Sequence, residues 1–94
     1  MIHKIKVDAD TYKKVNNRKR MAEIRSTADR HYGIGDTLHY CEVNEFGEFT
    51  GRELKKAVIC VIDDMEGLKE GYVLLVLILK KGKAYLNRIP KDMD

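Results

Sequence analysis

The sequence predicts an α+β fold made mainly of strands: a small barrel or strongly curved sheet of five to six mostly antiparallel strands with one or two short helices. Three observations lead to this class. Short apolar runs recur along the 94 residues, polar turns separate them at hairpin-like spacing, and one early segment has helical periodicity. A two-layer α+β sandwich is the alternative architecture.

The N-terminal residues predict one strand and one helix. Ile5 and Val7 alternate with lysines, which is the period-two pattern of a half-buried strand. Asp8 is a good N-cap, and Tyr12 and Val15 lie three residues apart, so residues 8–17 are expected to form a short amphipathic helix.

Alternation returns over residues 20–26. It places Glu23 and Arg25 on the same side of a predicted strand. A polar loop over residues 27–35 then leads into a third predicted strand at 36–43.

The C-terminal half predicts strands separated by turns. Residues 44–51 are rich in turn formers, with Gly47 at the expected tip of a hairpin. The apolar runs at 57–62 and 72–79 are typical of central strands that are covered on both faces, and a last strand is expected at 83–89.

The composition indicates one soluble domain over residues 1–94, with a polar tail at 89–94. Hydrophobic residues make up 44% and charged residues 35% of the chain, a balance that supports a packed core. The longest apolar run is far shorter than the roughly 20 residues of a membrane-spanning helix, and no signal peptide is recognisable. We therefore expect a cytoplasmic protein without a membrane segment, in which Cys41 and Cys60 are reduced and buried.

The charges are segregated along the chain. Residues 1–35 carry nine Lys and Arg against four Asp and Glu, residues 36–78 carry four against nine, and residues 79–94 carry five against two. If the two basic ends meet in space, the fold presents a positive face that attracts phosphate. The alternative is that the charges interleave on a solvated surface.

The most unusual segment runs from Arg18 to Arg30. Guanidinium groups bind phosphates or base edges with paired hydrogen bonds, and a carboxylate such as Glu23 accepts from the amino groups of a base. A simple surface ion pair between Glu23 and Arg25 is the competing interpretation.

Most of these residues also resemble, in order, a family of small ASCH-type domains in the PUA-like superfamily, a branch common in phages and bacteria. The resemblance covers nearly the whole chain. It rests on His3–Val7, Tyr12, Val15, Arg20–Arg25, Asp29–Arg30, Gly35–Asp36, Thr50–Gly51 and Gly67–Leu74.

The signature of that family is G-x-K-x-x-E-x-R, followed by Asp-Arg and Gly-Asp. Glu23 and Arg25 fit it, whereas the glycine is Arg18 and the lysine is Arg20. Because a guanidinium stays protonated, Arg20 weighs against catalysis by a deprotonated lysine.

The resemblance implies a PUA-like pseudo-barrel with a cleft that holds RNA or a modified nucleoside. Some relatives are amidohydrolases that act on N4-acetylcytidine with a Lys, a Thr and a Glu. The lysine position here is Arg20 and the threonine position is Glu23, so these two residues would carry any catalysis.

Three functions are therefore considered. The first is a non-enzymatic module that binds RNA or a nucleotide, in which Lys6, Arg20, Arg25 and Arg30 hold phosphate, Glu23 contacts a polar edge and Tyr32 stacks on a base. The alternatives are an amidohydrolase for a modified nucleoside and a phage-encoded factor that binds a protein through the acidic residues 36–70.

No metal or cofactor site is predicted. His39 and Cys41 lie two apart on one strand face, but the sequence has no CxxC and no matching second pair of ligands. His3 is expected to make a structural hydrogen bond, and Tyr72, at the start of an apolar strand, is expected to pack in the core.

Overall fold

The computed structural model describes residues 1–16 and 21–80. The elements follow one another as β1 (Ile2–Val7), α1 (Ala9–Val15), β2 (Ala22–Ser26), β3 (Thr37–Val43), β4 (Phe49–Ile62) and β5 (Tyr72–Lys80). The strand predicted at 83–89 and the tail at 89–94 lie outside the described residues.

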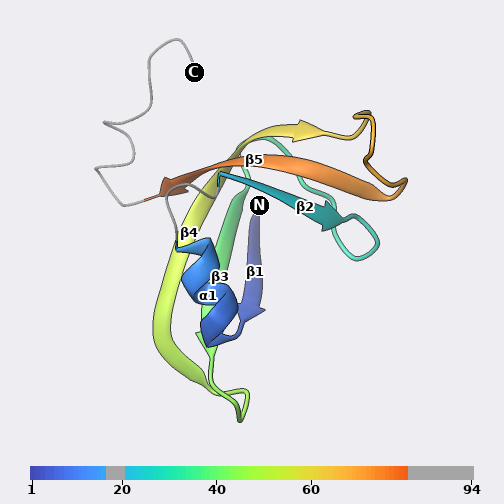
Figure 1. The fold of residues 1–94 in the computed structure, drawn as a ribbon. Helices are drawn as coiled ribbons and strands as arrows, with labels where there is room; N and C mark the ends of the chain where they lie inside the picture. Colours follow the sequence, from blue (N-terminus) through green and yellow to red (C-terminus); the bar gives the residue numbers. More distant parts are fainter. Residues whose placement is uncertain (17–20, 81–94) are drawn as a thin grey trace.

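The five strands form one strongly curved sheet in the order β1-β3-β4-β5-β2 (Figure 1). β1 pairs with β3 in parallel, and the other three pairings are antiparallel. The long strand β4 bends, and its register with β5 shifts between Val58 and Cys60. A bulge of this kind bends a strand. The curved sheet forms a half-barrel, and β4 runs through it on both sides of this bend. The predicted α+β class and curved, mostly antiparallel sheet are confirmed.

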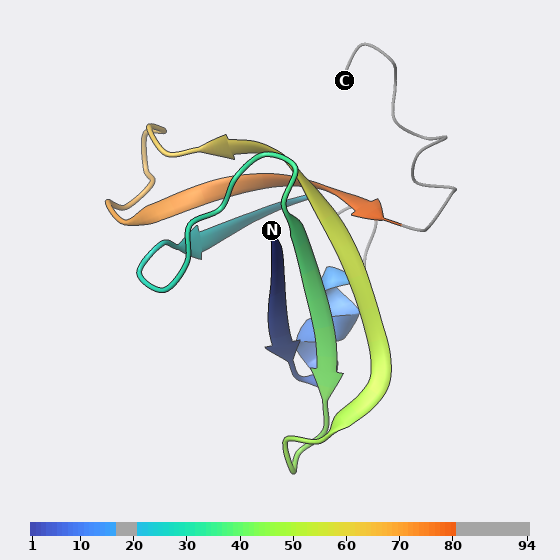
Figure 2. The same cartoon turned by 180° about the vertical axis from the view of Figure 1, so that it is seen from behind.

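The core lies on the concave face of this sheet. Alternate residues of neighbouring strands point inward together, because directly paired residues share a face. Helix α1 lies on this face and not on the opposite one (Figures 1 and 2), and it contributes Tyr12 and Val15. The buried cluster on the strands consists of Ile5, Val7, Leu38, Tyr40, Val58, Val73, Leu75 and Leu77.

Helix α1 begins as its sequence predicts. A carboxylate oxygen of Asp8 accepts a hydrogen bond of 2.7 Å from the backbone N–H of Thr11, which satisfies one of the unpaired donors of the first turn. The hydrogen bonds with the backbone and the side chain of Thr11, and to a lesser extent the charge of Lys14, lower the pKa of Asp8 below its ordinary value.

The strand β4 is longer than predicted, because it begins at Phe49 and not at Ala57. The turn is confined to Asn44–Glu48, where the backbone N–H of Asn44 donates to the carbonyl of Glu48 and Gly47 has a φ of 79°. The first half of β4 was not predicted as a strand, because its charged side chains are mostly exposed on both faces and give no apolar alternation.

Three burial predictions are wrong. β5 is covered on one face, whereas the side chains of Leu74, Val76 and Ile78 on the other face are half-buried. Tyr72 is 40% exposed, and Cys60 is half-buried while Cys41 is buried. Among the described residues, no helix is long and apolar enough to cross a membrane.

Asp36 links β1 to the start of β3 through hydrogen bonds. Its carboxylate accepts hydrogen bonds from Nε2 of His3 at 2.8 Å and from the backbone N–H of Gly33 at 2.9 Å, and the amino group of Met1 lies 3.0 Å away. The expected structural hydrogen bond of His3 is thus present. These contacts, that of His3 foremost, lower the pKa of Asp36 from 3.8 to about 2.

We predict an acid-labile contribution to stability from Asp36. Because its pKa is lower in the folded protein, its contribution is fully present above about pH 4 and is lost as the pH falls toward 2. The melting temperature of D36N should therefore decline less between pH 5 and about pH 2.5 than that of the unaltered protein. The exposed loop residue Asp64 provides the control, and an identical decline in D36N and D64N would contradict the assignment.

Candidate functional site

A cleft of about 310 Å³ lies between the two edge strands of the half-barrel. β1 and β2 occupy opposite ends of the sheet order, and the curvature of the sheet brings them to the two sides of this cleft. The loop between β2 and β3 forms the remaining wall. The lining residues are Ile5, Lys6, Arg25, Ser26, Asp29, Arg30 and Tyr32.

The loop between β2 and β3 is held against β1 by Arg30. Its Nη2 donates a hydrogen bond of 3.0 Å to the backbone carbonyl of Lys4. This contact uses one of the five N–H groups of a guanidinium. At its start the loop is tied to the turn that precedes β5, since the backbone N–H and the hydroxyl of Thr27 both donate to the carbonyl of Gly71.

The cleft is electropositive. Lys6, Arg25 and Arg30 line the cleft against the carboxylate of Asp29, and the buried carboxylate of Glu23 offsets the charge of Arg25, so a smaller positive excess remains. Side chains that bring like charges together at one concave surface attract an ion of the opposite sign. The cleft is therefore suited to an anion such as phosphate.

The guanidinium of Arg25 is held in position by Glu23, which lies on its buried side. Nε and Nη2 of Arg25 lie 3.2 and 3.1 Å from Oε2 of Glu23, so both contacts reach the same oxygen. The side chain of Glu23 is 5% exposed and that of Arg25 is 29% exposed. Burial lowers the pKa of Arg25, but the charge of Glu23 and the interactions with Tyr40 together raise it by more, so the net shift is upward.

Two further polar side chains lie beneath this pair, inside the half-barrel. Tyr40 and Lys56 are almost completely buried, and Nζ of Lys56 lies 5.6 Å from the centre of the Tyr40 ring. Burial, reinforced by the charge of Glu23, raises the pKa of Tyr40. Within the described residues, Oε1 of Glu23 and the hydroxyl of Tyr40 have no hydrogen-bond partner.

A second hollow of about 450 Å³ adjoins the cleft, because Tyr32 lines both. Its character is different. It contains aromatic and acidic side chains and no Lys or Arg: the lining residues are Thr27, His31, Tyr32, Val61, Asp63, Glu70, Gly71, Tyr72 and Val73. A planar, uncharged group with amino donors suits this hollow better than a phosphate does.

The structure brings together four of the six predicted site residues, namely Lys6, Arg25, Arg30 and Tyr32. Glu23 does not line the cleft and instead contacts Arg25 from the core. Arg20 lies outside the described residues.

Sequence reasoning missed four residues of the site region. Ile5, Ser26 and Asp29 line the cleft, but from the sequence Ile5 had only a place in a strand and Asp29 only a place in the family signature, and none of the three was expected to take part in binding. Lys56 could have been found, because alternation with Leu54 and Val58 assigns it to the inner face of β4.

Comparison with known families gives a match over most of the chain. A family model described as "Domain of unknown function (DUF3850)" matches residues 2–77, which include every described strand except the last part of β5. No curated protein matches the chain. Since the match extends over more than half of the sequence, the chain belongs to the DUF3850 family.

Proposed function

We propose that the protein binds RNA or a nucleotide, with phosphate in the cleft between β1 and β2 and a base in the adjoining hollow. The observation that carries this proposal is the grouping of Lys6, Arg25 and Arg30 around one concave surface. The resemblance to ASCH-type domains of the PUA-like superfamily supports the same ligand class.

The two hollows match the two chemical parts of a nucleotide. Arginine and lysine side chains in the cleft bind phosphate oxygens, and Arg25 is already oriented by Glu23. Tyr32 and Tyr72 in the second hollow offer rings on which a base can stack, and Asp63 and Glu70 can accept from its amino groups. Glu23 in this proposal positions Arg25 and does not contact the ligand.

We predict salt-dependent binding of short single-stranded RNA. Affinity should fall as salt rises, because each phosphate contact releases counterions. R30Q should weaken binding several-fold and reduce the slope of log K against log salt by about 0.7, the value for one contact to a single strand. Fluorescence anisotropy with a labelled oligonucleotide at several salt concentrations measures both effects.

The matched control is K13Q, which removes one exposed positive charge from α1, away from the cleft. K13Q should leave both affinity and slope nearly unchanged. Y32A should weaken binding by roughly 1–3 kcal/mol, as the loss of one stacking contact does, and should leave the salt slope intact. Equal losses in K13Q and R30Q, or no binding at low salt, would refute the proposal.

Two further assays of the purified protein distinguish this function from the two alternatives raised by the sequence. Release of cytidine from N4-acetylcytidine would favour an amidohydrolase, and its loss in E23Q would assign Glu23 to the reaction. A stoichiometric protein partner that survives nuclease treatment would favour an accessory factor.

A further inference from the structure

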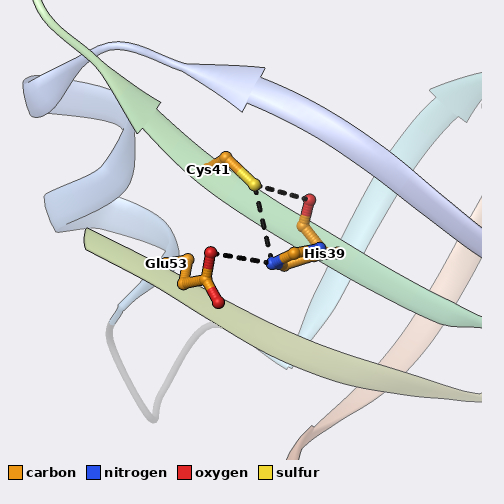
Figure 3. Close-up of side chains that lie close together, drawn as sticks. All are labelled: His39, Cys41 and Glu53. Atoms are coloured by element: carbon orange, nitrogen blue, oxygen red, sulfur yellow. Dashed lines mark hydrogen bonds and ion pairs between the residues drawn. The ribbon is translucent and has the colours of Figure 1, made fainter. Parts of the chain in front are cut away.

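We propose that His39, Cys41 and Glu53 bind a divalent transition-metal ion, with Zn²⁺ as the expected ion, on the convex face of the sheet (Figure 3). The sequence offered two of these ligands and no matching second pair, and therefore predicted no metal site. The third ligand comes from the neighbouring strand.

Strand pairing by itself places the three side chains together. His39 and Cys41 are two residues apart in β3, so they share a face. Glu53 on β4 pairs directly with Cys41 in the antiparallel ladder, which sets their Cβ atoms about 5 Å apart on that same face. The register shifts between Cys41 and Val43, immediately beside the cluster, and such irregularities reorient side chains.

The distances between the donor atoms fit a tetrahedral metal site. Nε2 of His39 lies 3.5 Å from Sγ of Cys41 and 3.3 Å from Oε2 of Glu53. Ligands at ordinary Zn–N, Zn–S and Zn–O bond lengths in a tetrahedron are about 3.3 to 3.6 Å apart. All three donor atoms lie within 4.8 Å of one another, and the Glu53 side chain, 57% exposed, has room to adjust.

The same geometry argues against a catalytic relay of Cys, His and Glu. In a relay, one ring nitrogen of the histidine contacts the nucleophile and the other contacts the carboxylate. Here both close contacts involve Nε2 (Figure 3). Lone pairs from three side chains that converge on one point are the arrangement that a metal ion requires.

The charges of the ligands also balance a divalent cation. A thiolate and a carboxylate neutralise Zn²⁺, and imidazole adds no charge. Lysines surround the cluster: Lys55 pairs with His39, and Lys4 and Lys6 lie on β1 beside it. The ammonium groups of Lys4 and Lys6 lie 4.6 and 5.5 Å from the centre of the Phe49 ring, which engages them in cation–π contacts.

The proposed site is distinct from the cleft and does not depend on the proposed function. None of its three ligands lines either hollow, and β1 separates β3 from the cleft. Three protein ligands leave a fourth position for water or for a donor from a bound molecule, as in zinc sites that are not purely structural.

Titration of the full chain with Co²⁺ tests the proposal. One equivalent should produce the visible bands of tetrahedral cobalt together with a thiolate charge-transfer band in the near ultraviolet. C41S should lose the charge-transfer band, whereas C60S, which removes the other thiol, should retain it. Absence of the band in the unaltered protein, or its loss in C60S with retention in C41S, would overturn the proposal.

His39 and Glu53 are more exposed than Cys41, so variants of these two ligands test the site even if C41S does not fold. H39Q and E53Q should keep the native circular dichroism spectrum and lower Zn²⁺ affinity at least ~10-fold, since even partners of metal ligands contribute that much. Competition with a chromophoric chelator measures the affinity. Unchanged affinity in both variants would exclude His39 and Glu53 as ligands, and with them the site.

Discussion

Replacement of Arg25 by methionine should lower the free energy of unfolding by about 3 to 5 kcal/mol, because it leaves the buried carboxylate of Glu23 without its partner. E23Q should lower the free energy of unfolding by less than the Arg25 replacement does. Arg25 keeps contact with water through a side chain that is 29% exposed, whereas Glu23 is 5% exposed and cannot be hydrated in place. Urea denaturation followed by circular dichroism measures both changes.

Two comparisons make this prediction specific to the buried pair. The double variant E23L/R25M should recover most of the loss, since an apolar pair of similar volume avoids the cost of burying charge. K14Q disrupts the ion pair with Asp10, whose side chains are 63% and 80% exposed, and should cost less than about 0.5 kcal/mol. If R25M were no more harmful than K14Q, Glu23 would not depend on Arg25.

The second large effect is expected in the core. Leu75 is fully buried on the concave face of β5 and pairs directly with Glu23 of β2. L75A should destabilise the protein by about 3 kcal/mol, the sum of lost apolar burial and of a cavity that a sheet cannot close. The same urea titration applies.

The exposed residue Ile24 is the control for Leu75. It lies on the same strand as Glu23 but on the opposite face, and it is 60% exposed. I24A should change stability by less than about 0.5 kcal/mol. A large loss in I24A would mean that the convex face of β2 is covered.

The parts of the fold that depend on local pattern were predictable. Period-two alternation located β1, β2 and β3, and a helix cap located the start of α1 at Asp8. The strand β4 was partly missed, because charged residues interrupt its apolar pattern before Ala57. Burial on both faces was wrongly expected for β5, since an apolar run does not reveal how many layers cover it.

The sequence predicted most residues of the candidate site, but it did not predict how they are arranged in space. Alternation correctly paired Glu23 with Arg25, but it could not tell which of the two faces the solvent. Lys6 and Arg30 meet only because the sheet curls and brings its two edges together. For the same reason Glu53 could not be joined to His39 and Cys41 before the register of β3 and β4 was known.

The parallel pairing of β1 with β3 has a consequence for the order of assembly. The first strand of the chain cannot dock until β3 exists, and β3 is itself stabilised by its hairpin with β4. Contacts between segments so distant in sequence form late, because the intervening chain must first lose its freedom. The pairing of β2 with β5 joins segments that are still farther apart in sequence. The cleft between β1 and β2 is therefore completed only after both pairings have formed, and a molecule that occupies it should slow unfolding of the entire domain.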